Sequence, residues 1–309
     1  MSPPDPPHPV KRALLIVNPG ARRATRARAE AARALERAGV EYEVITTVAP
    51  GHGADVMRER GARFDVVFTL GGDGTAIEVI TALAGGGPPV GILAGGTGNV
   101  LARSLGIPLL VSRAIPRLLA GTETRIDLGQ LADGRQFAIG LGVGLDAAMI
   151  AGASAAFKRR LGVLAYVWAA TRAALRVEKF RVHLTVDGVL HERSASSVMI
   201  ANLGSVLGGA ITFGQGIASD DGVLHACVYA PANLREAMRM FARMLRGRVH
   251  LDAGFSTFPG RHFLLETDPP RAAQADGELL GMTPLDVTVR PGAARLLVPA
   301  RPGVSGVSG

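Results

Sequence analysis

The chain has 309 residues, of which 48% are hydrophobic and 19% charged, so it can fill two folded domains and lacks the composition of a disordered protein. A single cysteine, Cys227, excludes an internal disulfide framework and a cysteine-rich zinc site. The formal net charge of +8 is carried almost entirely by arginine, whose planar guanidinium suits phosphate, which leaves nucleotides, anionic membranes and nucleic acids as candidate partners. A GC-rich genome, which favours arginine codons, would explain the same charge without any partner.

The two ends of the chain have the composition of flexible tails, over residues 1–10 and 301–309. The proline-rich start lacks the apolar segment of a secretory signal. No run of about 18 or more clean apolar residues occurs, so a membrane-spanning helix is not predicted. We therefore expect a cytoplasmic protein whose membrane contact is peripheral, at the inner face.

Residues 11–124 alternate strictly between strand-like and helix-like segments. The apolar run 13–17 is typical of a strand covered on both faces, and the arginine- and alanine-rich segment after it ends at Gly39 as helices do. The expected strands are 13–17, 41–47, 65–70 and 90–94, and the expected helices are 22–38, 54–60, 75–84 and 99–105. This alternation predicts an α/β domain whose parallel sheet carries helices on both faces.

The pattern changes near residue 125, where shorter strand-like segments begin, separated by Asp-Gly turns. The expected strands are 125–131, 137–141, 181–186, 197–202, 223–229, 263–267 and 284–289, and the expected helices are 161–176 and 233–245. Residues 125–300 therefore predict an antiparallel β-sandwich domain that follows the α/β domain.

Two glycine-rich turns in the first domain join a strand to a helix. The first, FTLGGDGTAIEV at 68–79, has three glycines around Asp73, and the second is VGILAGGTGNVLA at 90–102. In open α/β sheets ligands lie beyond the carboxyl ends of the strands, where backbone N–H groups at a helix start favour an anion. Three glycines in four positions exceed the needs of a turn. They indicate that the main chain approaches a phosphate.

Asp73 beside a phosphate is repulsive unless Mg²⁺ lies between them or the carboxylate contacts an attacking hydroxyl, and both are roles in phosphoryl transfer. Some residues have an ordinary structural alternative. Thr75 and Glu78 fit a helix capping box, and Asn99 fits a helix N-cap as well as a binding role. No P-loop motif occurs, and GVGLDA at 142–147 matches a dinucleotide fingerprint by chance, because it lies outside the alternating region.

The order of several motifs resembles that of the diacylglycerol kinase catalytic-domain family, which includes bacterial soluble lipid kinases and sphingosine kinases. The motifs are Asn18-Pro19, the T-x-x-x-G-H of residues 47–52, GGDGTAIEV, GTGN, RLGVLAY at 160–166, Asn202 with Gly208-Gly209, DDGVL at 220–224 and DGE at 276–278. The resemblance covers residues 12–299. Phosphofructokinases and NAD kinases also carry a GGDG turn and imply the same fold for the first domain.

For the first domain the resemblance implies an ATP site. The residues expected to line it are Asn18, Thr47, Gly71, Gly72, Asp73, Gly74, Thr75, Glu78, Gly96, Thr97 and Asn99. Asp73 is also expected to organise Mg²⁺ and phosphate.

For the second domain the resemblance implies a catalytic Glu278, the general base that takes the proton of the lipid hydroxyl. Asp221 corresponds to a cation site, with the backbone carbonyls of Ala218 and Val223 as further ligands. Asp127 falls where the family has an acidic residue behind the active site, and we group it with the metal residues. On local sequence alone, Asp221-Gly222 and Asp276-Gly277 are ordinary hairpin turns.

The chain departs from the family at Ala94, where proline is common, and at Val100, where bacterial members often have aspartate. A lysine common after the first strand is absent unless Arg22 or Arg23 replaces it. These departures bear on lipid specificity.

Residues 233–245 have the pattern of an amphipathic helix. Leu234, Met238, Phe241 and Leu245 fall on one face, and a stripe of arginines that includes Arg239 and Arg243 lies beside it. Two interpretations remain open: the helix docks on anionic headgroups, or it packs its apolar face on the sandwich and leaves a solvated arginine face.

The sequence thus predicts an ATP-dependent, Mg²⁺-dependent lipid kinase that acts on a diacylglycerol-like or sphingoid-like acceptor at a membrane surface, with a homodimer possible. The alternatives are a NAD kinase-like phosphotransferase and a catalytically silent lipid- or nucleotide-binding module. A nucleic-acid partner is not expected, because aromatic residues are few (5%) and no helix-turn-helix is recognisable.

Overall fold

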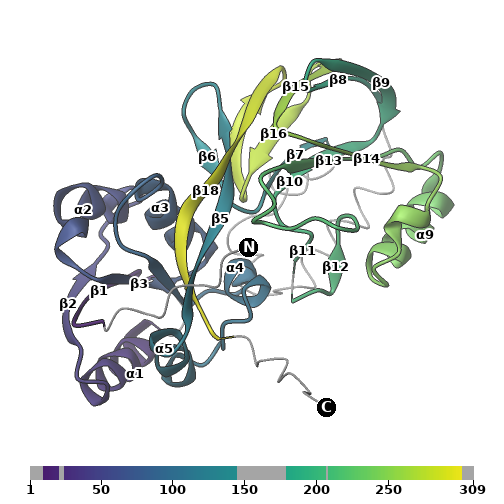
Figure 1. The fold of residues 1–309 in the computed structure, drawn as a ribbon. Coiled ribbons are helices and arrows are strands. Elements are labelled where there is room, and N and C mark those ends of the chain that lie inside the picture. The colour runs from purple at the N-terminus through teal and green to yellow at the C-terminus, as the bar shows by residue number, and fades with distance from the viewer. Residues whose placement is uncertain (1–9, 21–23, 145–178, 207, 301–309) are drawn as a thin grey trace, which may run out of the picture. The chain divides into compact units, whose positions relative to one another are not determined.

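The computed structural model describes residues 10–20, 24–144, 179–206 and 208–300 (Figure 1). The chain forms two compact units. Unit 1 comprises residues 1–96, 105–124 and 295–309, and unit 2 comprises residues 97–104 and 125–294. A single domain boundary after residue 124 does not describe this division completely. Residues 97–104 belong to unit 2, and the chain returns to unit 1 at residue 295. RLGVLAY and the helix expected at 161–176 lie outside the described residues.

Unit 1 contains a parallel sheet with the strand order β2-β1-β3-β4. The strands are β1 (Arg12–Val17), β2 (Glu41–Thr46), β3 (Val66–Gly71) and β4 (Val90–Ala94). The last residues of β18 (Leu285–Val298) extend this sheet, since Leu296 pairs in parallel with Val90. The apolar runs of β1 and β3 are buried, as expected of strands covered on both faces.

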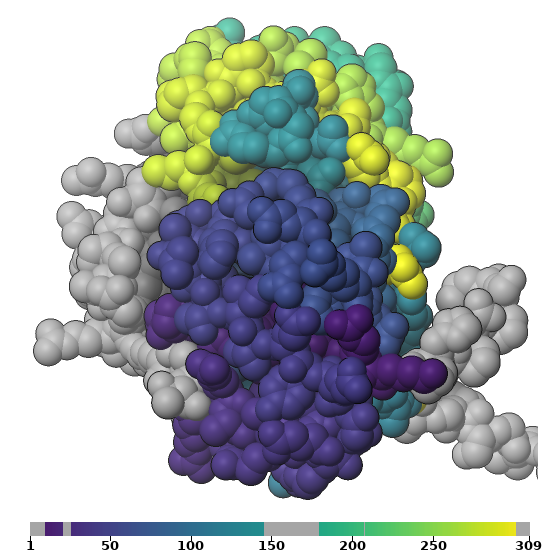
Figure 2. All heavy atoms as spheres, turned by 90° about the vertical axis from the view of Figure 1, so that its left-hand side faces the viewer, coloured from purple at the N-terminus to yellow at the C-terminus, as the bar shows by residue number. Residues whose placement is uncertain are grey.

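Helices cover both faces of this sheet, with α1 and α5 on one side and α2 and α3 on the other (Figure 1). They are α1 (Ala24–Arg37), α2 (His52–Arg60), α3 (Asp73–Ala82) and α5 (Val111–Leu119), with a 3₁₀ turn at Gly61–Arg63. Most of the purple and dark blue atoms that face the viewer in Figure 2 belong to this unit. Helix α5 was missing from the predicted elements because Pro116 interrupts its pattern, but its Val111, Ala114, Ile115 and Leu118 are buried.

Unit 2 is built on two antiparallel sheets. In the first, β18 pairs with β15 (His262–Asp268) and β5 (Thr122–Leu131), and β15 continues to β8 (Phe180–Val186) and β9 (Val189–Ala195). Strand β6 (Gln136–Phe137) pairs with β5. The second has the order β14-β13-β10-β7-β16-β17. Its strands are β7 (Gly140–Gly144), β10 (Ser197–Ala201), β13 (Leu224–Tyr229), β14 (Phe255–Gly260), β16 (Ala272–Ala275) and β17 (Glu278–Met282).

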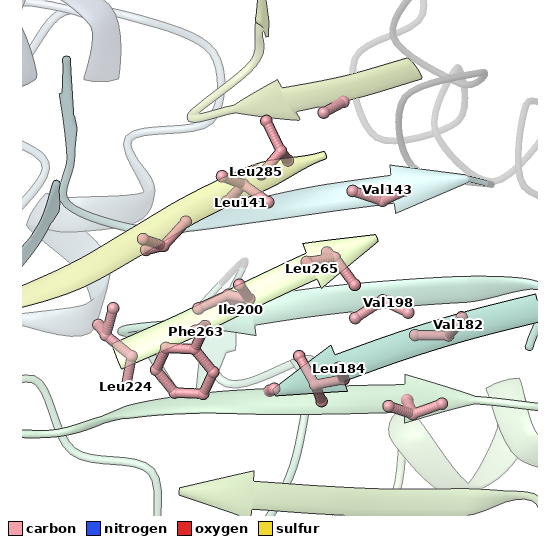
Figure 3. Packing of buried hydrophobic residues seen from close by; sticks show 14 of the residues in the cluster. Leu141, Val143, Val182, Leu184, Val198, Ile200, Leu224, Phe263, Leu265 and Leu285 are labelled. Carbon is pink, nitrogen blue, oxygen red and sulfur yellow. The ribbon is translucent and has the colours of Figure 1, made fainter. Parts of the chain in front are cut away.

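The core of unit 2 lies between these sheets (Figure 3). Alternate residues of β8 and β15, such as Leu184 and Phe263, meet Leu141 of β7 and Ile200 of β10, and all four are fully buried. Because side chains alternate across a strand, each sheet presents one apolar face to the other. The predicted antiparallel β-sandwich is confirmed. GVGLDA begins in antiparallel β7, which agrees with its dismissal as a dinucleotide fingerprint.

The outer face of the second sheet is covered by helix α9 (Leu234–Met244) and a 3₁₀ turn at Val249–Leu251. A small apolar cluster under them includes Met199, Cys227, Tyr229 and Met240, and burial raises the pKa of the Cys227 thiol to about 12. Unit 2 also holds the short helix α4 (Val100–Ser104) and the paired strands β11 (Ser205–Val206) and β12 (Ile211–Thr212). Among the described residues, no helix is both long enough and apolar enough to cross a bilayer.

Candidate functional site

The four parallel strands of unit 1 end at the same edge of the sheet. The register pairs Val17 with Thr46 on one side and with Leu70 on the other, and Gly71 with Ala94. The order β2-β1-β3-β4 changes direction between β1 and β3, which is where α/β sheets bind ligands. The segments that leave this edge carry Asn18, Thr47, Gly71–Thr75 and Gly95-Gly96.

Backbone hydrogen bonds continue past the strands and hold these segments together. The N–H of Asn18 donates to the carbonyl of Leu70 at 2.9 Å, and that of Thr47 donates to the carbonyl of Val17 at 2.9 Å. The N–H of Gly95 donates to the carbonyl of Gly71 at 2.8 Å, so the two glycine-rich turns lie against each other. A Cβ at Gly95 would lie 3.2 Å from the backbone of Gly71, which explains this glycine.

The three glycines around Asp73 have different reasons to be glycine. A Cβ at Gly71 would lie 2.6 Å from the Oγ1 of Thr75, so the start of α3 requires this glycine. A Cβ at Gly74 would meet nothing within 4 Å, and at Gly72 its nearest neighbour would be the Cα of Gly96 at 3.7 Å, an ordinary contact. Neither residue has a positive φ. Packing and conformation leave Gly72 and Gly74 unexplained, whereas close approach by a ligand would explain both.

Asn18 and Thr75 are brought together as parts of the frame. The side-chain amide of Asn18 donates to the Oγ1 of Thr75 at 2.9 Å, and its oxygen accepts from the N–H of Gly20. Thr75 is buried, and so is Thr47, whose hydroxyl donates to the carbonyl of Val17 at 3.4 Å. These side chains fix the shape of the strand edge.

Glu78 does not form a capping box with Thr75, so that interpretation is wrong. Helix α3 begins at Asp73 with Gly72 as its N-cap, three residues before the position at which a Thr75 cap would start it. The Oε1 of Glu78 instead accepts the N–H of Ala54 at 3.1 Å, in the first turn of α2. A Cβ at Gly53 would lie 2.9 Å from this oxygen, so the second glycine of the GHG motif makes room for the contact.

Asp73 is the first residue of α3 and is half-buried, so its carboxylate lies where backbone N–H groups begin the helix. Gly96 is half-buried and closes unit 1's second glycine turn. Thr97 and Asn99 belong to unit 2, where Thr97 is exposed and Asn99 is buried with a left-handed φ of 47°. These four residues stay predicted nucleotide contacts.

In unit 2, Asp127 connects three segments of the chain. Its carboxylate accepts the N–H of Gly222 and the N–H of Gly292, both at 2.7 Å, while its own N–H donates to the carbonyl of Ser219 at 2.6 Å. Its carbonyl accepts from the buried side chain of Asn202 at 2.7 Å. These bonds account for the burial of the carboxylate without a metal. As a metal ligand Asp127 stays a prediction.

Asp221 lies in the turn that Asp127 holds. One of its carboxylate oxygens accepts the N–H of Val223 at 3.1 Å, and the other is 3.4 Å from the Nε2 of His225. Ala218, whose carbonyl is a predicted ligand, precedes Ser219 in the same turn. In the part of the chain that the structure describes, no group of three His, Cys, Asp or Glu side chains gathers as a metal site. A cation at Asp221 would therefore need backbone carbonyls, as the prediction supposes, and also water.

Asp276 and Glu278 lie in the hairpin between β16 and β17. Asp276 has a φ of 50°, and its carboxylate accepts the N–H groups of Ala138, Ile139 and Gly140 at 2.7, 2.9 and 3.0 Å. Glu278 begins β17 with its side chain exposed. The Asp-Gly sequence does form a hairpin turn, and its aspartate fixes that hairpin to the start of β7. This tie was not predicted, because backbone donors 136 to 138 residues away leave no mark in the sequence.

Comparisons with known proteins agree with this architecture. Residues 12–131 match the family described as diacylglycerol kinase catalytic domain, and residues 140–298 match the YegS C-terminal NAD kinase beta sandwich-like domain. The two matches cover the two kinds of sheet described above.

Individual relatives show the same likeness. The chain is 28% identical to a diacylglycerol kinase of Bacillus subtilis over 281 residues, which cover 89% of this chain and 92% of the relative. It is 29% identical to an uncharacterized protein of Synechocystis over 75% of this chain, but spans only 54% of that relative's length. A solved structure of a diacylglycerol kinase from Bacillus anthracis superposes with a TM-score of 0.80 at 23% identity, over 96% of this chain and 99% of that one, which shows the fold.

Proposed function

The chain belongs to the diacylglycerol kinase catalytic-domain family and is a lipid kinase, and we propose that it transfers the γ-phosphoryl group of ATP to a hydroxyl of a diacylglycerol-like or sphingoid-like lipid. The observation that supports this most directly is the main chain at Gly72 and Gly74. The protein itself gives neither position a reason to lack a side chain. An ATP phosphate against these two residues supplies that reason.

In the proposed ATP site, each element of the strand edge has a distinct task. The first turn of α3 offers backbone N–H groups to the phosphates. The Asn18–Thr75 hydrogen bond and the contact between Gly71 and Gly95 hold that turn in place. Preorganised donors of this kind stabilise charge that develops on the transferred phosphoryl group, at no cost of rearrangement during the reaction.

The residues present fit Mg²⁺ if the nucleotide supplies part of its coordination. Mg²⁺ is usually held by one or two carboxylates, water and substrate phosphates, and Asp73 provides one carboxylate at the helix start. When bound, the ion would neutralise charge on the phosphates. Asp73 would hold it in position.

The acceptor hydroxyl must lose a proton as its oxygen attacks phosphorus. Glu278 is proposed as the general base, because an exposed carboxylate at the start of β17 is accessible to a substrate and Asp276 fixes the hairpin that carries it. In this step the O–H bond of the lipid breaks, an O–P bond forms, and ADP leaves. Glu278 retains the proton until it passes to solvent.

Replacement of Asp73 tests the proposal. Asp73→Asn should lower lipid-dependent ATP hydrolysis and lipid phosphorylation by about a thousandfold or more, because the carboxylate that orients metal and phosphate is lost. The matched control is Asp55→Asn, which neutralises an exposed aspartate in the first turn of α2. Full activity of Asp73→Asn, with an unchanged melting temperature, would refute the assignment.

The same assay separates the remaining candidates. The sandwich domain is described as NAD kinase-like, so radiolabelled ATP should be offered with NAD in parallel with a total lipid extract. Phosphorylated lipid without phosphorylated NAD is the expected result. Phosphorylation of NAD alone would support the phosphotransferase alternative, and ATP binding without turnover would support a silent binding module.

A further inference from the structure

Helix α9 exposes an apolar stripe. Leu234, Met238 and Leu245 are 39%, 62% and 50% exposed, and the adjoining Leu251 of the 3₁₀ turn is 61% exposed. At about 100° per residue, the three side chains of the helix region fall within about 40° of one another. Met240, the buried residue of α9, lies about 120–160° away from them and packs on the sheet below. The stripe therefore points away from the surface on which the helix rests.

Two of the arginines beside the stripe are structural. The Nε of Arg239 donates to Asp252 at 3.1 Å, and the Nη1 of Arg243 donates to the same carboxylate at 3.0 Å. Burial raises the pKa of Asp252, but hydrogen bonds from Arg239 and the Gly254 N–H, with the charges of both arginines, outweigh it and leave that pKa below its ordinary value. Of the two interpretations of this helix, the one that packs its apolar face on the sandwich is wrong, because the stripe faces outward. Docking on anionic headgroups stays a prediction, although Arg239 and Arg243 bind Asp252 and anchor the helix.

Other cations flank the stripe. Arg235, Arg246 and Arg248 are exposed. Arg235 and Arg246 fall about 60–120° from the stripe residues, on the side away from Met240. An outward apolar stripe with cations along one edge has the composition of helices that lie in the headgroup region of an anionic bilayer.

We propose that Leu234, Met238, Leu245 and Leu251, with Arg235 and Arg246, form a docking surface for an anionic lipid bilayer, here named the α9 surface. The charge supports a bilayer rather than a second copy of this chain, since two such surfaces face to face would bring like charges together. The inference rests on the proposed function, because a kinase of bilayer lipids must collect its acceptor from a membrane. It adds the surface through which that contact is made.

The test is sedimentation of the full chain with vesicles of equimolar phosphatidylcholine and phosphatidylglycerol, compared with vesicles of phosphatidylcholine alone. Wild type should bind the anionic vesicles. The pair Arg235→Glu and Arg246→Glu should weaken that binding about tenfold or more, through loss of attraction to the headgroups. The pair Met238→Gln and Leu245→Gln leaves the charge unchanged and should weaken it by a similar factor, through loss of apolar insertion.

Matched controls lie on the β8–β9 hairpin of the same unit. Val189 and Leu190 are 59% and 56% exposed, so Val189→Gln with Leu190→Gln reproduces the apolar change elsewhere. Arg181→Glu with Arg193→Glu, both at exposed arginines, reproduces the charge change. These controls should bind as wild type does. Failure of wild type to sediment, wild-type binding by the α9 variants, or equal losses in the controls would each overturn the proposal.

Two further measurements distinguish bilayer docking from dimerisation and from the proposed kinase activity. Light scattering that shows a dimer abolished by Met238→Gln with Leu245→Gln would assign the surface to a second copy and overturn the bilayer. Phosphorylation of detergent-dispersed lipid should be the same in wild type and α9 variants. If no lipid is phosphorylated while vesicle binding follows the α9 surface, the kinase assignment fails and the docking surface stands.

Discussion

The two units hold their candidate residues in opposite ways. In unit 1 the candidate residues follow strands that end together, and backbone contacts between glycines, such as Gly71 and Gly95, fix their geometry. In unit 2, Asp221 lies in a turn and Glu278 in a hairpin. The carboxylates of Asp127, in strand β5, and of Asp276 fix these two segments through backbone N–H groups far away in the sequence. Acidic residues that look alike in the sequence motifs thus fall into two groups. Some bind the backbone and support the structure, whereas others are exposed.

This contrast shows that an aspartate can belong to a functional motif without taking part in the reaction. The carboxylate of Asp276 makes three hydrogen bonds with main-chain donors, whereas that of Glu278, two residues later, is exposed. Substitution at the first should act on stability, and substitution at the second on turnover.

Among the variants that compare Asp276, Glu278 and the glycines, the largest effect is expected for Glu278→Gln. Loss of the proposed general base should lower kcat by roughly 10²–10⁴-fold. Because the side chain is exposed, the melting temperature should stay within about 1 °C of wild type. Single-turnover phosphoryl transfer and thermal unfolding of the same preparation measure both quantities. Loss of stability comparable to the loss of activity would show that Glu278 is structural and that the contrast is false.

Asp276→Asn should act on stability. Asparagine tolerates the positive φ, but its amide nitrogen would meet the N–H of Ala138 in place of a carboxylate oxygen. We expect a loss of about 2 kcal/mol in the free energy of unfolding, measured by urea titration. Asp133→Asn is the control, since this Asp-Gly turn is exposed and its carboxylate bonds locally to Arg135. Equal effects in the two variants would contradict the anchor role.

The glycines of unit 1 allow a smaller but sharper test. Gly74→Ala should leave stability unchanged or higher, because alanine favours a helix and its Cβ has space, yet it should raise the KM for ATP about tenfold by obstructing the phosphate. Gly71→Ala should instead lower stability by about 1–3 kcal/mol through its contact with Thr75. If Gly74→Ala left the KM for ATP unaltered, the phosphate would have to lie elsewhere.

The smallest effect concerns pH. The pKa of Asp252 lies below its ordinary value of 3.8, so its pairing with Arg239 and Arg243 stabilises the fold fully above that value and is lost as pH falls through the lower, folded-state pKa. Wild type should melt a few degrees above Asp252→Asn at about pH 5 and higher, and the gap should narrow progressively as the pH falls below 3.8. Thermal scans across this range measure it, and a gap that persists in acid would contradict the linkage.

The sequence was sufficient for the fold because each unit has a clear periodicity. Strand-like segments such as 13–17 and 65–70, separated by helical patterns, predict parallel strands, and Asp-Gly turns between short alternating segments predict the sandwich. The register of the strand ends then followed from a general property of parallel sheets. The helix at Val111–Leu119 was not predicted, because Pro116 disfavours a helix in the sequence, whereas burial of its apolar face stabilises the helix in the fold.

The roles of individual polar residues could not be predicted in the same way. That Glu78 contacts the first turn of α2, and that Asp252 receives two arginines of α9, depends on distances in space with no regular spacing in the chain. One signal was present: Gly53, a second glycine in the PGHG turn, marked a close approach, although not the group that approaches. The direction of the α9 stripe was likewise ambiguous, since either face of an amphipathic helix satisfies the same periodicity.

Strands β5 and β18 both pass from one unit into the other, and the C-terminal end of β18 contributes Leu296 to the parallel sheet of unit 1. During synthesis on the ribosome, the parallel sheet of unit 1 therefore lacks this strand until residues 285–298 have been made. An isolated N-terminal fragment would expose the edge of β4, a template for aggregation, so the enzyme is poorly suited to being divided into exchangeable modules.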